Sequence, residues 1–422
     1  MNISRWEVNG MVTKFAELYG HDADVQKARY EQIAKGYETC YGACNNLEFF
    51  SAPGRTEVGG NHTDHNHGCV LAAAVNLDIV AAAAPNGENI VRLKSLEYEK
   101  MDEIDLSDLS VQEQEKEKSA SLIRGVCARC RELGYQVGGF NAYTATQVLK
   151  GSGLSSSAAF EVAVVTVISH LFNDGKIDPV EAAQIAQYAE NVYFGKPSGL
   201  MDQTASSVGG FTAIDFHDPA KPVLEKVDFD LDTYGYALCI VDTGGNHADL
   251  TGDYASIPVE MKSVAKLLGA EVLRDVDESV FWSKLGELRQ KAGDRAVLRA
   301  MHFFSDNRIA QEEAALLKKG DFEGFKAKII ESGRSSATRL QNVFACSNPS
   351  EQGLSVALAV SETLLAGKGA WRVHGGGFAG TIQAFVPKAF LAEYREKMEA
   401  VFGEGTCHVL SIRSAGGVKV EI

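Results

Sequence analysis

The turn KGSGLSSSAA at residues 150–159 is the feature that most constrains how this chain can fold. It follows a strand-like run, GGFNAYTATQVL, and opens a long apolar helix that continues as FEVAVVTVISHLF. Glycines let backbone N–H groups approach an anion closely, and a helix N-terminus offers free N–H groups with a partial positive charge. The pattern therefore favours a phosphate-binding turn. A Gly/Ser turn that only caps the helix is the alternative.

Two nucleotide-binding patterns can be set aside. The chain has no G-x4-G-K-[ST] sequence, so the turn is not a Walker A loop. A second glycine cluster, GGGFAG at 375–380, formally matches GxGxxG, but the TIQAFV that follows reads as a strand. A dinucleotide site needs a helix at that place. The cluster is either a tight turn alone or part of another ligand site.

The loop PGRTEVGGNHTDHNHG at 53–68 concentrates polar side chains, namely Arg55, Glu57, Asn61, His62, Asp64, His65 and His67. Zinc sites favour compact spacings with cysteine, or an HExxH helix, and this loop has neither. Asn, Asp and His are also the usual donors and acceptors for sugar hydroxyls. The pattern favours recognition of a polyol, with a metal site and a solvated loop as alternatives.

Asp202 lies in PSGLMDQTASS, next to Met201 and a run of small residues, so we expect it to be partly buried. Buried carboxylates are paired or functional. Because Asp is a common N-cap residue, a helix cap is the alternative.

The order of elements predicts an α+β enzyme of two domains, because strands and helices interleave without a repeat of 20–50 residues. Helices are expected at 1–45, 117–133, after Asp178-Pro179, and at 254–268, 282–301, 305–319 and 386–402. Residues 88–109 read as a sheet edge, and a second unit begins near 229. No flexible linker marks this boundary, so we expect a firm interdomain contact, where ligands often bind.

The net charge of −15 disfavours nucleic acid and anionic membranes as partners. No run of 18 apolar residues and no secretory signal is visible, so we expect no membrane span and a cytoplasmic location. The eight cysteines are scattered, and the lone CxxC of Cys127 and Cys130 is interpreted as reduced thiols, with a metal site as the alternative.

Four motifs, in order, resemble those of the galactokinases in the GHMP kinase superfamily. PGRTEVGGNHTDHNHG resembles the signature GR-x-N-x-x-GEH-x-DY, KGSGLSSSAAFEVA the phosphate motif, GLMDQ the catalytic GIMDQ, and VHGGGFAG the third motif, in a match from Phe49 to Val386. The resemblance implies an N-terminal ribosomal-S5-like domain at 1–228 and a C-terminal ferredoxin-like domain at 229–422. The active site then lies between them.

The resemblance also assigns roles. Asp202 matches the catalytic aspartate, and Arg55 the arginine near it and the γ-phosphate. The sugar ligands would be Asn61, His62, Asp64, Ser198, Gly199 and Tyr254. The ATP ligands would be Gly151, Ser152, Gly153, Leu154, Ser155, Ser156, Ser157, Ala158, Gly376 and Gly377. Mg²⁺ would be held by Ser157 and Glu190.

The loop departs from the signature at three positions. Glu57 stands where the signature has Asn, Asn61 where it has Glu, and His65 where it has Tyr. The missing glutamate normally accepts a hydrogen bond from a sugar hydroxyl far from C1, and Asn61 can still donate and accept. A neutral amide would also repel a C6 carboxylate less. The arginines that commonly follow the family's tyrosine are replaced after Tyr254 by Ala255-Ser256-Ile257-Pro258.

The resemblance implies phosphorylation of the anomeric C1 hydroxyl of galactose with MgATP, by a monomer. A GHMP kinase for a modified sugar such as galacturonate or N-acetylgalactosamine is the first alternative. The second is a sugar sensor without catalytic activity. Some galactokinase-like regulators of that kind lose residues of the SSSAA loop. Here that loop, Arg55, Glu190 and Asp202 are all present, which favours an enzyme.

Overall fold

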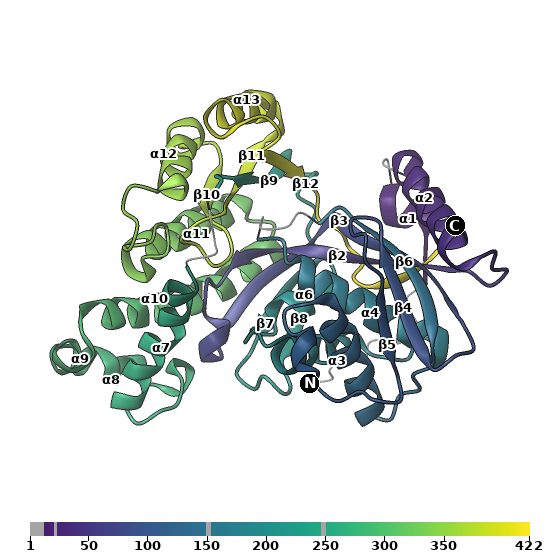
Figure 1. Cartoon of the computed structure of the whole chain (residues 1–422). Coiled ribbons are helices and arrows are strands. Elements are labelled where there is room, and N and C mark those ends of the chain that lie inside the picture. The colour runs from purple at the N-terminus through teal and green to yellow at the C-terminus, as the bar shows by residue number, and fades with distance from the viewer. Residues whose placement is uncertain (1–11, 21–22, 149–152, 246–249) are drawn as a thin grey trace.

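The computed structural model describes residues 12–20, 23–148, 153–245 and 250–422. The predicted nucleotide ligands Gly151 and Ser152 lie outside the described residues. The chain forms two lobes, each built on its own sheet with helices packed on it (Figure 1). This arrangement confirms the prediction of an α+β fold.

The first lobe contains a nine-stranded sheet, with described strands in the order β1-β13-β2-β3-β6-β4-β5 and with β7 and β8 joined to β3. Its strands are β1 (Val12–Lys14), β2 (Glu48–Gly59), β3 (Cys69–Pro85), β4 (Ile90–Ser95), β5 (Asp102–Asp105), β6 (Phe140–Thr146), β7 (Phe211–Asp215), β8 (Val223–Val227) and β13 (Val418–Glu421). Strands β4 and β5 form an edge of the sheet, as predicted for residues 88–109.

Helices cover both faces of this sheet. They are α1 (Phe15–Tyr19), α2 (Ala23–Tyr41), α3 (Ser119–Glu132), α4 (Ser156–Asn173), α5 (Pro179–Tyr188) and α6 (Met201–Val208). Side chains of a strand point to alternate faces, so Val80 and Ala82 pack with α2, while Ala81 and Ala83 belong to the cluster that contains α3, α4 and α5. The prediction for Asp178 is confirmed, because its carboxylate accepts from the N–H groups of Val180 and Glu181.

Helix α4 is the core helix of this lobe. Among the described residues it is the one helix long and apolar enough to cross a membrane, and 61% of it is buried inside the protein. Its apolar side chains are used in packing against β2 and β3, which explains the hydrophobic run that follows the Gly/Ser turn.

The second lobe contains a four-stranded sheet in the order β10-β11-β9-β12. Its strands are β9 (Tyr236–Asp242), β10 (Ala370–Val373), β11 (Thr381–Pro387) and β12 (Cys407–Leu410). Its helices are α7 (Thr251–Leu267), α8 (Glu278–Ser283), α9 (Leu285–Ala292), α10 (Asp294–Lys318), α11 (Phe322–Ser335), α12 (Gly353–Leu365) and α13 (Leu391–Phe402). The break expected between 301 and 305 is wrong, because α10 continues through that point with Phe303 and Phe304 buried in a core cluster.

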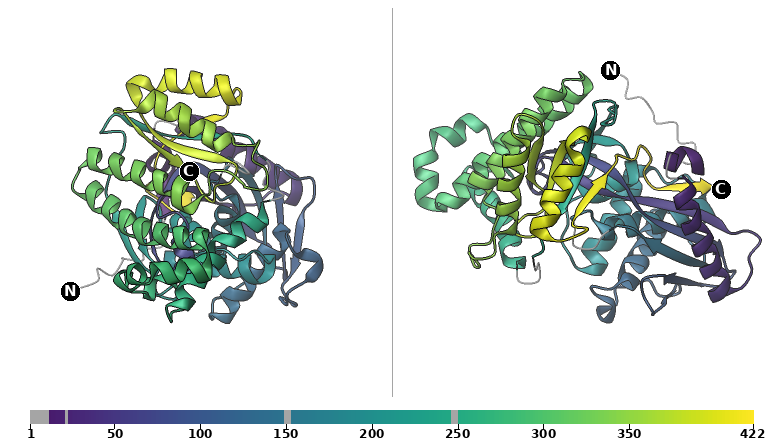
Figure 2. Two further views of the ribbon diagram at one scale, coloured as in Figure 1. Left: turned by 90° about the vertical axis from the view of Figure 1, so that its left-hand side faces the viewer. Right: turned by 90° about the horizontal axis from the view of Figure 1, so that it is seen from above.

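The two lobes share one core. A single cluster contains Val58 and Leu71 from β2 and β3 together with Phe325 and Ile329 from α11. The last strand, β13, returns to the first lobe and pairs with β2, so that Val418 lies opposite Ser51 (Figure 2). The predicted boundary between the two domains at residue 228 stays a proposal. Strand β13 lies after that boundary in the sequence but belongs to the sheet of the first lobe.

Candidate active site

A partly buried ion pair joins strand β2 to helix α6. Arg55 Nε donates to Asp202 Oδ1 at 2.7 Å, and the Ser155 hydroxyl donates to Asp202 Oδ2 at 2.6 Å. Arg55 also donates to the carbonyl oxygen of Gly153. The structure therefore brings together Arg55, Asp202 and the serine-rich turn. The capping alternative for Asp202 is wrong, because Leu200 is the N-cap residue of α6.

The N-terminus of α4 lies beside this pair. Ser155 is the N-cap residue, in a left-handed conformation with φ of 56°, and its side chain makes no capping hydrogen bond. Its hydroxyl is used by Asp202 instead. The first N–H groups of α4, from Ser156 onward, therefore have no side-chain cap and can receive an anion. Gly153 has a φ of +72° and is closely packed, since a Cβ atom there would lie 2.9 Å from His374 Nδ1.

The charge state of Asp202 is set by its neighbours. Burial would raise its pKa, but the Arg55 charge and the hydrogen bonds from Arg55 and Ser155 outweigh burial and lower the pKa to about 2. Burial likewise opposes the charge of Arg55, and Asp202 raises its pKa. The pair is therefore ionised at neutral pH. A carboxylate with so low a pKa is a weak base.

A second group of polar side chains surrounds Glu190, on the helical turn Ala189–Phe194. Ser157 Oγ and Lys196 Nζ each lie 3.0 Å from Glu190 Oε1, and Gln203 donates to Glu190 Oε2 at 2.8 Å. Gln203 also donates to the buried Glu161 at 3.1 Å. The sequence prediction named Ser157 and Glu190 but missed Lys196 and Glu161. The spacing of Ser157 and Glu161 on one helix face was the available signal for the latter.

The polar loop lies against the second glycine cluster, at 375–380. His62 Nε2 is 3.0 Å from the carbonyl oxygen of Gly376, and the Tyr254 hydroxyl donates to the carbonyl oxygen of Gly377 at 2.7 Å. Burial lowers the pKa of His62 to about 4, so its imidazole is neutral at neutral pH. TIQAFV is part of strand β11, as predicted, so the cluster is a turn that contacts the polar loop.

Gly199 is required by its contact with Asp64. A Cβ atom at Gly199 would lie 1.9 Å from Asp64 Oδ2, so any other residue there would displace the carboxylate. The neighbouring Ser198 donates from its backbone to Asn191 Oδ1 at 2.7 Å, which fixes this segment next to Asp64. Gly199 therefore lines the loop from the α6 side, whereas the hydrogen bonds of Ser198 are with Asn191 and Gln187.

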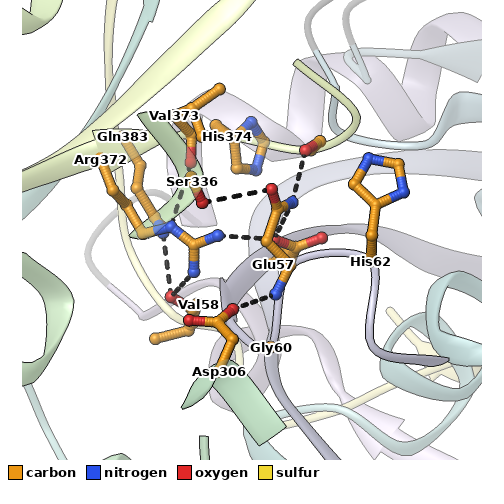
Figure 3. Close-up of polar contacts among 12 residues, drawn as sticks. Glu57, Val58, Gly60, His62, Asp306, Ser336, Arg372, Val373, His374 and Gln383 are labelled. Atoms are coloured by element: carbon orange, nitrogen blue, oxygen red, sulfur yellow. Dashed lines mark hydrogen bonds and ion pairs between the residues drawn. The ribbon is translucent and has the colours of Figure 1, made fainter. Parts of the chain in front are cut away.

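Asn61 is placed differently from the other predicted ligands. It is fully buried. Figure 3 shows the polar contacts among the residues of this region, with Glu57, Ser336 and Asp306 labelled. Its side-chain amide donates to Glu57 Oε1 at 2.8 Å and to the carbonyl oxygen of Gly375 at 2.7 Å. Its side-chain oxygen accepts from Asn342 at 2.8 Å and from Ser336 at 3.4 Å. These contacts leave the side chain no free donor or acceptor for a ligand.

The described residues contain no group of three His, Cys, Asp or Glu side chains arranged to hold a metal ion. The histidines of the polar loop therefore do not form such a group. Cys127 and Cys130 are buried free thiols, and burial raises the pKa of Cys127 to about 12. A thiol with that pKa is a poor metal ligand and a poor nucleophile.

Two family models match the chain. The GHMP kinases N terminal domain matches residues 121–210, and the galactokinase galactose-binding signature matches residues 35–85. Galactokinase of Streptomyces coelicolor is 31% identical over 358 residues, which cover 84% of this chain and 88% of that protein. This chain belongs to the galactokinase family. The family that the four motifs predicted is thereby confirmed.

Other relatives agree with this assignment. Galactokinase of Actinobacillus pleuropneumoniae is 29% identical over 80% of this chain and 84% of its own length. The crystal structure of Lactococcus lactis galactokinase complexed with galactose superposes with a TM-score of 0.79, at 23% identity, over 94% of this chain and 100% of that one. Mevalonate kinase of Methanococcus jannaschii gives a TM-score of 0.63 at 12% identity, covering 88% and 99% of the two chains. These likenesses confirm the GHMP kinase fold of this galactokinase-family chain.

Removing the Arg55 charge should raise the pKa of Asp202. In Arg55→Met burial remains but the counter-charge is lost, so we expect a pKa above the ordinary 3.8 in place of about 2. The ¹³C NMR titration of the carboxyl carbon measures this change. Because the folded pKa of the wild-type lies below the unfolded one, the pair's stabilisation is present above pH 4 and is lost as the pH falls toward 2.

Arg92→Met is the matched control, because Arg92 pairs with the exposed Glu88 on the sheet edge. It should leave the Asp202 titration unchanged. An Asp202 pKa that stays near 2 in Arg55→Met would contradict the electrostatic account.

Proposed function

We propose that this protein transfers the γ-phosphoryl group of ATP to the anomeric hydroxyl of galactose. The observation that carries the proposal is the contact of Asp202 with both Arg55 and Ser155. It unites an ionised carboxylate, a guanidinium and the first turn of an uncapped helix in one place. The curated relatives that match most of this chain are named galactokinase, and one similar solved structure is a complex with galactose.

Asp202 orients the acceptor hydroxyl. Its carboxylate is ionised, so it accepts a hydrogen bond from the anomeric hydroxyl and directs the oxygen toward the phosphorus. Phosphoryl transfer needs little covalent assistance, so positioning and electrostatic stabilisation supply most of the rate. Arg55 carries the positive charge that stabilises the transferring group, and it keeps Asp202 ionised.

The phosphates of ATP bind at the N-terminus of α4. The turn at 153–158 provides backbone N–H groups, and Ser156 begins the helix whose partial positive charge favours an anion. The glycine turn at 375–377 lies on the other side of this place, since Gly153 packs against His374. This supports the proposal that both glycine segments hold the nucleotide.

The sugar is bound by the polar loop. Asp64, His62 and Tyr254 supply a carboxylate, a neutral imidazole and a phenol, which together can donate to and accept from sugar hydroxyls. The contact of Gly199 with Asp64 supports placing the ring between the loop and the start of α6.

Mg²⁺ is the metal ion we propose for this site. Ser157 Oγ donates to Glu190 Oε1 at 3.0 Å, so the two oxygens are neighbours, and the ammonium group of Lys196 pairs with the same Glu190 oxygen, which supports a cation at this place. The residues therefore fit a Mg²⁺ ion, which takes few protein ligands and completes its shell with waters and phosphate oxygens. When bound, the ion would neutralise phosphate charge.

A monomeric working unit and a cytoplasmic location, where ATP is available, are part of the same proposal.

Asp202→Ala should abolish sugar-dependent ADP release, with a loss of about 10³-fold or more, while ATP binding by calorimetry stays within about threefold. The assay should compare galactose, N-acetylgalactosamine, galacturonate, arabinose and glucose, with the phosphorylated carbon of the product assigned by NMR. Asp174→Ala, at an exposed pair with Lys176, is the control and should be fully active. Wild-type rates in Asp202→Ala would refute the role of Asp202.

Glu190→Gln should raise the Mg²⁺ concentration for half-maximal activity by about tenfold or more, because a carboxylate ligand becomes a neutral amide. Saturating Mg²⁺ should recover part of the rate. Glu132→Gln, at an exposed pair with Arg129, is the matched control and should leave the Mg²⁺ requirement unchanged. A lower kcat in Glu190→Gln with an unchanged Mg²⁺ requirement would speak against Glu190 as the metal ligand.

A further inference from the structure

Glu57 and Asn61 form a buried carboxylate–amide pair in the wall of the sugar-binding loop. The amide of Asn61 is fully occupied by Glu57, Gly375, Asn342 and Ser336, and its backbone N–H donates to Asp306 Oδ2 at 2.6 Å. Turning this side chain toward a ligand would break contacts on both lobes. Asn61 therefore positions its neighbours and joins β2 to the second lobe.

Glu57 differs from Asn61, because only one of its two carboxylate oxygens accepts hydrogen bonds from the described residues. Oε1 accepts from Asn61 at 2.8 Å and from Arg372 at 2.9 Å, while no hydrogen bond from the described residues reaches Oε2. The exposed fraction of the Glu57 side chain is 6%, whereas the side chain of Arg372 is fully buried. In Figure 3 the Glu57 carboxylate lies between the Arg372 guanidinium and the His62 imidazole, with one oxygen on the His62 side.

The position of Glu57 along β2 places this oxygen at the far end of the sugar site. Arg55, Thr56 and Glu57 pair in unbroken register with Ala74, Ala73 and Ala72. Side chains two residues apart in a regular strand share a face and lie about 6.6 Å apart. Arg55 marks the reacting end through Asp202, so Glu57 lies about one sugar ring away from it.

Resting on the proposed function, we propose that Glu57 is a specificity-determining residue whose Oε2 accepts a hydrogen bond from a galactose hydroxyl away from the reacting carbon, at C4 or C6. Asn61 is the positioning residue that holds Oε1 so that Oε2 faces the sugar. The carboxylate that the signature places at 61 is thus supplied from 57, and the amide that it places at 57 is supplied from 61.

The surroundings support a carboxylate with this task. Burial raises the pKa of Glu57 to about 7, against the opposing charges of Arg372 and Arg55. A hydroxyl donor from the sugar favours the ionised form, whereas a C6 carboxylate would face both Glu57 and Asp64. In its ionised form Glu57, together with Asp64, would repel a C6 carboxylate, so this form disfavours galacturonate, which the neutral Asn61 had left open.

The test compares wild-type protein with Glu57→Gln, which keeps an oxygen for Arg372 and removes the charge. We expect the galactose Kd by calorimetry and the galactose KM to rise about 10- to 100-fold, with the ATP KM within about twofold. The melting temperature should fall, because the fully buried Arg372 loses its counter-charge. The same assays on galactose analogues lacking one hydroxyl at a time identify the partner. The penalty of Glu57→Gln should vanish for the 4-deoxy or the 6-deoxy sugar.

The double variant Glu57→Asn with Asn61→Glu separates this role from a structural one. It returns the pair to the signature order, so galactose affinity should recover to within about threefold of wild-type, whereas Asn61→Glu alone places two carboxylates together and should bind weakly. Unchanged galactose affinity in Glu57→Gln would overturn the proposal. So would a loss of ATP affinity together with sugar affinity, or a penalty that persists for every deoxy sugar.

The proposed function fails in a different way. Wild-type protein that binds galactose but releases no ADP would overturn the kinase proposal while the Glu57 assignment is still decided by the Kd of Glu57→Gln. Wild-type protein that does not bind galactose would overturn both.

Discussion

The ion pair between Arg55 and Asp202 holds together segments that lie 147 residues apart in the chain. It draws the Ser155 hydroxyl away from its capping role, so the start of α4 is left open to an anion. It also keeps Asp202 ionised despite burial. The same contact therefore assembles the site, exposes the helix N-terminus and sets the charge state on which the chemistry depends.

A second set of contacts fixes the two lobes around that pair. Strand β2 supplies Arg55 to the ion pair with Asp202 and Glu57 to the ion pair with Arg372 from β10. Asn61 adds hydrogen bonds to the turn after β10 and to the region after α11. Because this junction is buried and shares a core cluster, the sugar-binding loop has little freedom to move relative to the glycine turn at 375–377.

Much of this was visible in the sequence, because motif chemistry and strand alternation are local. The start of α4 after the serines, the sheet edge at 88–109 and the Asp178 cap depend on neighbouring residues. The unbroken α10 and the return of β13 to β2 depend on packing with distant segments. A local sequence pattern does not predict such long-range packing. The same holds for Asn61, whose type suits a sugar ligand but whose four side-chain contacts come mainly from the other lobe.

The most direct test of the account is a crystal structure with galactose, Mg²⁺ and a non-hydrolysable ATP analogue. The account predicts the anomeric oxygen within hydrogen-bond distance of Asp202, the phosphates at the N-terminus of α4, and the far side of the sugar against Glu57. Galactose bound away from Asp202, or phosphates that leave the start of α4 uncontacted, would contradict it.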